Sequence, residues 1–437
     1  MLKFRLFAFF PTFFSTFLSA FFSTALAQAP DDLDALTLAD SAADKAPAAV
    51  SDWHSFIEGA LGQSQPRQGK HNSNRRISLD LQFEQRFAPG WRAVFSDRLD
   101  LNRQQQQAHE SLANDVNTVR EAYLSWQPQP QQLADLGRIN VPYGVASGYN
   151  PTDFFRGNAV RSVVSVDPAS LKKNRMGSVM LRGQHLWDSG SVTALYSPQL
   201  AQQPNSGSFN PDLGATNSQD RWLIALSQKL PDGIVGDITP QWIIHGAAQA
   251  APQIGMNLTT LLNDATVAYL EYSGGRSRSM LSQALHGKDD SAFRNRLASG
   301  LTYTTASKLS LTLEYEYNGS ALNDQGWSAL RNGIKHGAAL PYLQYRQWQQ
   351  NQQELATREE VFLYASWPDA MLQHLDLSAM QKLNLADHSR LSWLEARYHL
   401  EHVDLALQWQ RNSGELSSTY GAALQKYSWQ ALLRYYF

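Results

Sequence analysis

Five basic side chains fall in one stretch of the sequence between Tyr143 and Arg175. They are Arg156, Arg161, Lys172, Lys173 and Arg175, and only Asp153 and Asp167 oppose them, which leaves a local excess of 5 − 2 = 3 positive charges. Such a stretch can favour anionic or polar solutes if the rest of the chain holds it in a water-filled passage. The surrounding sequence must therefore supply the wall of that passage.

Alternation of side chains predicts a wall of β-strands. Several stretches of about ten residues are apolar at every second position and polar or charged between, most clearly 77–84, 309–317, 403–410 and 427–437. A period of two indicates a strand with one apolar face. Many such segments in series are typical of a transmembrane β-barrel. Backbone groups cannot stay unpaired in lipid, so such a sheet must close on itself.

The connections predict the same architecture, because short turns alternate with long polar loops, as in a barrel inserted from one side. We predict an all-β, antiparallel up-and-down barrel of about 18 strands, with about 16 as the alternative. This count includes weak strands near 277–286 and 340–348. The predicted turns are 88–90, 128–131, 188–190, 231–233, 305–307, 368–372 and 401–402, and the predicted loops are 62–73, 104–116, 143–175, 199–219, 249–264, 287–293, 319–355 and 412–423.

The N-terminal sequence predicts export. Lys3 and Arg5 precede a Phe-rich apolar run, and residues 25–27, Ala-Leu-Ala, offer the small side chains of a signal-peptidase site. Residues 1–27 are therefore predicted to be a cleaved signal peptide, and a transmembrane anchor is the less favoured alternative. The Asp-bearing residues 28–52 are predicted to be a periplasmic leader, and residues 53–437 the barrel.

Composition excludes several classes of protein. The 437 residues include no cysteine, which excludes zinc–thiolate sites and thiol nucleophiles. The 12 Trp and 17 Tyr suit the aromatic girdles of a membrane barrel. The net charge of −2 argues against nucleic acid as a partner. The eleven histidines are scattered, so the sequence predicts neither a metal nor a cofactor.

Charged residues of the strands are expected to face the lumen, because an Arg or Lys on the lipid face costs roughly 2–4 kcal/mol at the midplane. One interpretation is a basic constriction that favours anions. The other is that opposite charges on neighbouring strands only pair and stiffen the wall. The strand residues predicted to line the lumen are the basic Arg86, Arg92, Arg98, Arg138, Arg182 and Arg434, and the acidic Asp80, Glu84, Asp100, Glu314, Glu316, Asp376 and Asp404.

The end of the chain resembles the β-signal by which Gram-negative outer-membrane barrels are handed to their assembly machinery. Phe437 is the last residue, and Tyr435, Leu433, Ala431 and Trp429 hold the alternate hydrophobic positions before it. The resemblance implies the outer membrane as location. It also implies membrane lipid and the barrel-assembly machinery as partners.

Residues 118–156 resemble porin-like outer-membrane barrels, a group in which some members export alginate or other polysaccharides. The shared elements are 120–124 (REAYL), 137–138 (GR), 143–144 (YG) and 150–153 (NPTD). Ile139 and Tyr143 depart from this pattern, in which Gln and Trp are common. The resemblance covers about 40 residues and implies a porin-like architecture.

These observations together predict a passive outer-membrane channel, not an enzyme, for small polar or anionic solutes, with export of a saccharide or polymer as a further option. The longest predicted loop, 319–355, carries Trp327, Tyr342, Tyr345 and Trp348 near basic residues. These side chains could bind a sugar or could pack the loop against itself. The sequence leaves open whether barrels form homotrimers.

Two other functions stay open. His71 and Ser73 resemble a short motif of outer-membrane acyl hydrolases, in which a histidine activates a serine nucleophile, although Arg75 replaces the usual glycine. A structural or assembly role of a plugged barrel is the second alternative.

Overall fold

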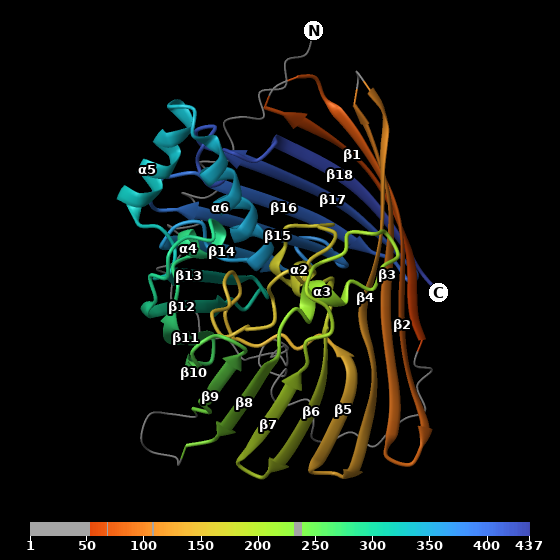
Figure 1. Ribbon diagram of the computed structural model, residues 1–437. Coiled ribbons are helices and arrows are strands. Elements are labelled where there is room, and N and C mark those ends of the chain that lie inside the picture. Colours follow the sequence, from red (N-terminus) through yellow and green to blue (C-terminus); the bar gives the residue numbers. More distant parts are fainter. Residues whose placement is uncertain (1–52, 68, 107–108, 231–237) are drawn as a thin grey trace. The chain divides into compact units, whose positions relative to one another are not determined.

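The computed structural model describes residues 53–437 except 68, 107–108 and 231–237, so the predicted signal peptide, the leader and the turn at 231–233 lie outside the described residues. The described residues form an 18-stranded sheet (Figure 1). Each strand pairs with its neighbours in sequence, and β18 also pairs with β1. The predicted antiparallel barrel of about 18 strands is confirmed, and the alternative of 16 strands is wrong.

The strands follow one another around the ring, and helices occur in the connections between them. The strands are β1 (Trp53–Pro66), β2 (Asn72–Ala88), β3 (Trp91–Gln106), β4 (His109–Gln129), β5 (Gln132–Ile139), β6 (Ser178–Trp187), β7 (Gly190–Ser197), β8 (Arg221–Gln228), β9 (Gln241–Ala247), β10 (Gln253–Asn263), β11 (Thr266–Ser277), β12 (Ala292–Thr304), β13 (Ser310–Asn318), β14 (Glu359–Trp367), β15 (Leu375–Asn384), β16 (Arg390–His399), β17 (Val403–Ser413) and β18 (Gln425–Tyr436). The helices are α2 (Pro168–Lys173), α3 (Leu213–Thr216), α4 (Met280–Ala284), α5 (Asp324–Lys335) and α6 (Ala339–Gln352). Within the described ranges, no helix combines the length and the apolar character needed to span a membrane.

The ring closes between the first and last strands. Phe56 lies opposite Tyr436, and the antiparallel register continues as far as Gln65 opposite Tyr427. The backbone N–H of Phe437 donates to the carbonyl oxygen of Ser55 at 3.2 Å. Closure pairs both terminal strands, which would otherwise expose their backbone groups along an open edge.

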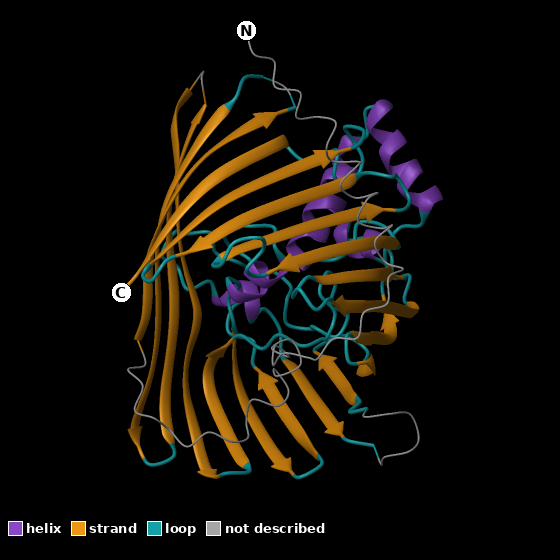
Figure 2. Cartoon of the chain, turned by 180° about the vertical axis from the view of Figure 1, so that it is seen from behind, coloured by secondary structure: helices purple, strands orange, loops and turns teal. Residues whose placement is uncertain are grey.

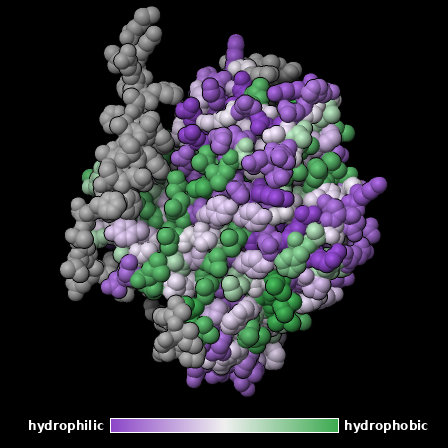
Figure 3. Space-filling model, turned by 90° about the vertical axis from the view of Figure 1, so that its left-hand side faces the viewer, coloured by the Kyte–Doolittle hydropathy of each residue, from purple (hydrophilic) through white to green (hydrophobic). Residues whose placement is uncertain are grey.

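Alternation separates an apolar outer face from a polar inner face. On β13, Leu313 and Tyr315 are exposed on the outside, whereas Glu314 and Glu316 are fully buried on the inside. In Figure 3, apolar side chains lie among polar ones in the middle and lower part of the visible face, and polar side chains predominate along its upper margin. The hydrophobic positions predicted for the last strand lie on the outer face too: Trp429, Leu433, Tyr435 and Phe437. This outer surface is the kind that lipid requires.

Several predicted connections differ from the structure. Residues 253–263, predicted within the loop 249–264, form β10, so that loop is divided into connections at 248–252 and 264–265. The connection at 385–389 is not among the predicted ones. Strands β1 to β4 extend into the predicted loops 62–73 and 104–116. The weak strands predicted near 277–286 and 340–348 are wrong, because these residues belong to connections that contain α4 and α6. Tyr342 and Tyr345 are both buried, and a spacing of three suits one face of a helix.

The wall is uneven in height. Strand β4 has 21 residues, whereas β5 and β8 have 8 each and β9 has 7. Beyond the last pair of β4 with β5, the N–H of Asn117 donates to the carbonyl of Ser208 at 2.8 Å. The guanidinium of Arg161 donates to the carbonyl of Asn117 at 3.0 Å. Loops therefore complete the wall where β5 ends.

We expect Leu313→Arg to destabilise the barrel in a phospholipid bilayer. Leu313 lies in the middle of β13 on the outer face, where a guanidinium costs roughly 2–4 kcal/mol. Urea unfolding of protein refolded into vesicles measures the change in free energy of unfolding. The control is Leu424→Arg, because Leu424 is 88% exposed in the connection before β18. An equal loss in both variants would contradict the outer-face assignment.

Candidate functional site

The connection between β5 and β6, residues 140–177, lies inside the barrel and is called the internal loop below (Figures 1 and 2). Its Thr152 hydroxyl is 2.9 Å from Asn257 Oδ1 of β10, and its Asp167 accepts from the hydroxyl of Tyr364 of β14 at 3.1 Å. On another side of the ring, Gln430 of β18 donates to the carbonyl of Val164 at 3.1 Å. The loop thus crosses the lumen, in agreement with the prediction that residues 143–175 fold inward.

Glu271 of β11 holds the first part of the internal loop. Its carboxylate accepts hydrogen bonds from the backbone N–H groups of Val145 and Ala146, both at 3.0 Å. It also accepts from the backbone N–H and the hydroxyl of Thr152, both at 2.8 Å, and from the side-chain amide of Asn150 at 3.1 Å. One buried carboxylate therefore fixes both ends of a turn in the loop.

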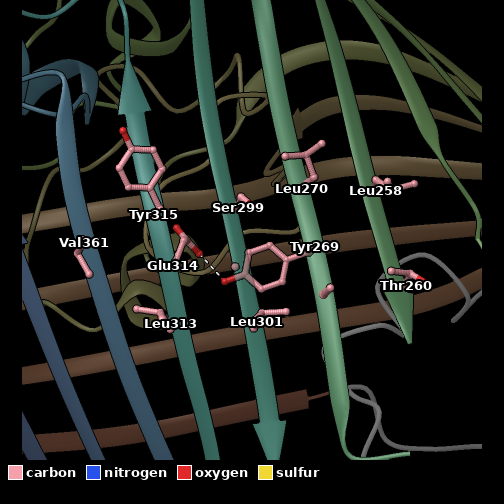
Figure 4. A pocket seen from close by; sticks show the side chains of 12 residues that line it. Leu258, Thr260, Tyr269, Leu270, Ser299, Leu301, Leu313, Glu314, Tyr315 and Val361 are labelled. Atoms are coloured by element: carbon pink, nitrogen blue, oxygen red, sulfur yellow. Dashed lines mark hydrogen bonds between the residues drawn. The ribbon is translucent and has the colours of Figure 1, made fainter. Parts of the chain in front are cut away.

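Glu314 of β13 holds the residues within that turn. It accepts from the backbone N–H groups of Ser147, Gly148 and Tyr149 at 2.8, 3.1 and 3.0 Å. Hydrogen bonds to an ionised group contribute about 1.5–3 kcal/mol each, more than neutral ones. The hydroxyl of Tyr269 adds a fourth hydrogen bond at 2.6 Å (Figure 4).

A glycine lets Tyr269 reach Glu314. Tyr269 and Glu314 belong to β11 and β13, and Gly300 of β12 lies directly between them in register. A Cβ atom at Gly300 would come within 2.4 Å of the Tyr269 hydroxyl. Beside this contact, Leu258 of β10, Leu270 of β11 and Leu301 of β12 line an apolar hollow of about 670 Å³ (Figure 4).

Two further acidic residues, Glu316 of β13 and Glu360 of β14, complete this side of the lumen. The name acidic wall is used below for the four carboxylates Glu271, Glu314, Glu316 and Glu360. A Cβ atom at Gly148 would lie only 2.2 Å from Glu316 Oε1, so the loop backbone rests directly on that carboxylate. Lys382 of β15 donates to the carbonyl of Gly148 at 3.1 Å and lies 3.8 Å from Glu360. The acidic wall and Lys382 therefore grip the loop through its backbone.

Basic residues dominate a second cluster, on β1 to β4 and β18, which is called the basic wall. Arg98 lies within ion-pair distance of three carboxylates, with N···O distances of 3.0 Å to Glu58, 3.4 Å to Asp80 and 3.0 Å to Asp100. The basic wall consists of Arg76, Arg98, Arg120 and Arg434 with Glu58, Asp80 and Asp100. Pairing of opposite charges across strands is what the second interpretation of these residues predicted, and Asp404, 4.0 Å from Arg434, places a fourth carboxylate beside the four guanidinium groups.

Other predicted site residues form separate pairs. Arg92 contacts Glu84 at 2.8 Å, and Arg182 contacts Asp135 at 2.6 Å. Asp376 and Asp404 both contact the ring of His399, at 3.1 and 2.8 Å. Arg86 is exposed near the turn between β2 and β3. These residues lie along the inner face without converging on one point.

Three predicted basic residues bond to backbone carbonyls instead of carboxylates. Arg138 donates to the carbonyls of Val119 and Pro211 at 3.2 and 2.6 Å. It is on the opposite side of β5 from its neighbour Ile139, which belongs to an apolar cluster beneath the internal loop. Arg161 donates to the carbonyls of Asn117, Gly207 and Asn210. Lys172 donates to the carbonyl of Ala146 at 3.0 Å.

The remaining charged side chains of the internal loop differ in their ion pairs and in their exposure. Asp153 pairs with Arg175 at 2.5 Å, and Arg156 pairs with Glu354 at 2.7 Å. Burial would raise the pKa of the Glu354 carboxyl, but Arg156 and Arg296 lower that pKa below its ordinary value. Burial lowers the pKa of Lys172, although Glu271 opposes the shift. Lys173, by contrast, is exposed.

Sequence reasoning missed several residues of the site, which are Glu58, Arg76, Arg120, Glu271, Glu360 and Lys382. Arg120 pairs with Asp80 at 2.7 Å, but a β-bulge in β4 leaves Arg120 without a partner residue on β3, so simple alternation does not place it. Glu271 follows the alternation of β11, with Leu270 and Tyr272 on the other face. Assigning a strand at 266–277 would have found Glu271 together with Glu314 and Glu316.

The aromatic residues of the connection 319–358 pack against each other. Trp327, Tyr342 and Tyr345 are buried in one cluster, and Trp348 packs against it. The indole N–H of Trp327 donates to Asp387 at 2.8 Å. These contacts favour the packing interpretation over a sugar site at these side chains.

The predicted hydrolase pair gains no support from the geometry. His71 precedes β2, and its ring lies edge-on to Tyr427 with centroids 6.3 Å apart. Ser73 is the second residue of β2 and faces Gln63 in register. Among the hydrogen bonds of the described residues, none joins His71 to Ser73.

Comparisons with known proteins place the fold. No protein-family model matches the chain, and no curated protein matches it. Solved structures do: OccAB1 of Acinetobacter baumannii has a TM-score of 0.54 at 11% identity, with 88% of this chain and 96% of that chain covered. OccK7 (OpdD) of Pseudomonas aeruginosa has a TM-score of 0.52 at 10% identity, with 89% and 99% covered. OccK5 (OpdH) of the same organism has 0.52 at 8%, with 88% and 97% covered.

The chain has the fold of a porin-like outer-membrane barrel. At these levels of identity the likeness concerns the fold alone. The resemblance that the sequence indicated is confirmed to that extent, over nearly the whole length of the compared chains.

We expect Glu314→Gln to loosen the internal loop. The amide keeps the size of the carboxylate but loses its charge and one acceptor oxygen, so the N–H groups of residues 147–149 are held less strongly. Hydrogen exchange at these three amides should accelerate roughly tenfold, measured by mass spectrometry on the refolded protein. Glu401→Gln is the control, since the Glu401 side chain is 90% exposed in a turn. Unchanged exchange at 147–149 would contradict the anchoring role.

Proposed function

We propose that the protein is a passive channel of the Gram-negative outer membrane for small polar or anionic solutes. The observation that carries this proposal is the internal loop, which crosses a closed barrel between an acidic and a basic wall. A loop in that place narrows the passage, and the charges beside it select what passes. The fold that the chain shares with OccAB1 and OccK7 agrees with the proposal.

The outer surface supports the location. Apolar and aromatic residues occupy the outward positions of the strands, and charged residues occupy the inward positions. The last strand carries the predicted assembly signal, Trp429, Leu433, Tyr435 and Phe437, on the lipid-facing side. The proposed partners are therefore outer-membrane lipid and, during biogenesis, the barrel-assembly machinery.

Charge and space support small anionic or polar solutes over a polymer. Four guanidinium groups gather on the basic wall, and Lys173 adds an exposed ammonium on the loop. The acidic wall is fully buried, and loop N–H groups already occupy Glu271 and Glu314. The loop leaves less room for a polysaccharide than an empty barrel would. Assembly into homotrimers stays a prediction, to be measured by native mass spectrometry.

We expect Lys173→Gln to reduce anion preference. Planar-bilayer recording under a salt gradient gives the reversal potential, and loss of one exposed positive charge should move it toward cation selectivity. Lys308→Gln is the control, because Lys308 lies in a turn and pairs with Asp369 at 3.2 Å. A wild-type protein that conducts cations preferentially would overturn the anionic part of the proposal, and one that does not conduct would overturn the channel itself.

We expect Phe437→Ser to reduce the amount of barrel that reaches the outer membrane severalfold. The substitution removes the terminal aromatic side chain, which contacts the ring of Tyr435 with centroids 5.3 Å apart. Quantitative immunoblotting of outer-membrane fractions measures the level. Phe209→Ser is the matched control, because Phe209 is 70% exposed in a loop and Phe437 is 69% exposed. Equal levels of both variants would argue against an assembly role for Phe437.

A further inference from the structure

We infer that a cavity between the internal loop and strands β8 and β9 is a binding subsite for an uncharged, hydroxyl-bearing solute of about monosaccharide size. The inference rests on the proposed channel function and names a class of solute for it. The cavity has a volume of about 240 Å³. This is slightly below the roughly 300–1,000 Å³ of pockets that hold drug-sized ligands, so it suits a single small ring.

Three connections and two strands meet at this cavity. The internal loop contributes Phe154 and Asn158, and the connection 198–220 contributes Ser218 and Gln219. Gln352 comes from the end of α6, and Arg221 and His245 come from the inner faces of β8 and β9. Backbone contacts tie these parts together, since the N–H of Asn158 donates to the carbonyl of Asn351 at 2.6 Å. The subsite is therefore built at the point where the loops converge on the wall.

Two buried side-chain nitrogen atoms at the cavity lack hydrogen-bond partners. Arg221 and His245 are each 8% exposed, and Arg221 Nε and His245 Nε2 have no partner among the described residues. The other nitrogens of Arg221 donate to the carbonyls of Phe154 and Thr216 and to the hydroxyl of Ser178. A buried polar group without a partner costs about 1–3 kcal/mol, which a ligand or water in the cavity would recover.

Aromatic contacts hold both groups in place. The ring of His245 stacks on Phe154 with centroids 4.4 Å apart and planes inclined by 1°, and it lies edge-on to Phe155 at 6.0 Å. The guanidinium carbon of Arg221 lies 4.4 Å above the Phe155 ring. Functional groups whose orientation is fixed by neighbours bind a ligand at lower entropic cost.

The other polar side chains of the cavity make no hydrogen bond to the described residues, so they are available to a ligand. Within the described part of the chain, no hydrogen bond uses the side chains of Asn158, Ser218, Gln219 or Gln352, and no Asp or Glu lines the cavity. Amides, hydroxyls and a neutral imidazole each offer both a donor and an acceptor. A hydroxyl group also does both, whereas a carboxylate only accepts and would leave the acceptors at the site unmatched. Arg221 Nε–H can donate to an oxygen of either kind of solute, but only a hydroxyl-bearing solute also donates to the amide and hydroxyl acceptors, so the lining suits a polyhydroxylated solute better than a simple carboxylate.

Glucose is the probe for this subsite. Isothermal titration calorimetry of the full-length protein, refolded in detergent, should detect glucose binding, and planar-bilayer recording should detect block of the ion current by the same sugar. His245→Phe keeps a ring against Phe154 but removes both nitrogens, so the dissociation constant and the half-blocking concentration should rise roughly three- to tenfold. Gln352→Leu, from another connection, should act in the same direction.

The controls separate the subsite from the channel. His185→Phe makes the same substitution at an exposed histidine of β6 and should leave binding unchanged. Binding without conduction would support the subsite and overturn the proposed channel, whereas conduction without glucose binding would overturn only the subsite. Acetate that binds or blocks where glucose does not, or equal glucose binding by the wild type and both cavity variants, would also overturn the inference. A β-sheet circular dichroism spectrum confirms that each variant has folded.

Discussion

The pairing of β1 with β18 is the constraint on which the remaining structure depends. An open sheet of this length would expose two edges of unpaired N–H and C=O groups, and lipid offers no partner for them. Once Phe56 faces Tyr436 and the ring is closed, the register of each strand decides which of its side chains point outward and which point into the barrel. One side of every strand must face outward, and the other faces a confined interior. The internal loop begins and ends on the adjacent strands β5 and β6, so it has that interior to occupy.

Charged residues inside the barrel have two different structural roles. On the acidic wall, Glu271 and Glu314 are surrounded by N–H and O–H donors and hold the loop. On the basic wall, Arg98 and Arg120 are held by carboxylates of neighbouring strands and stiffen the sheet itself. Burial of these four side chains is tolerable because Glu271 and Glu314 accept several hydrogen bonds each, and Arg98 and Arg120 pair with carboxylates. The separation also gives the interior of the barrel an uneven electrostatic field.

The amino-acid sequence predicts the barrel well and the site less well. A period of two needs only local information, so strands such as Leu309 to Tyr317 and the outward apolar positions of the last strand can be read directly. The same rule failed at 340–348, which form part of α6. There Tyr342 and Tyr345 lie on one face of the helix and pack in a cluster with Trp327. It also failed at Arg120, where a bulge shifts the register. The cavity at Arg221 and His245 depends on three connections that meet only in space, and local patterns carry no signal for such a meeting.

The manner in which the wall grips the loop has an evolutionary consequence. Glu271 and Glu314 bind the loop mainly through peptide N–H groups at positions 145–149 and 152, and every amino acid except proline supplies that group. Substitutions along the loop can therefore alter its chemistry while its path is inherited unchanged. Gly148 is an exception, because any larger residue would collide with Glu316. Proteins that inherit this scaffold could therefore differ in the side chains that their loops present, while the barrel and the path of the loop stay the same.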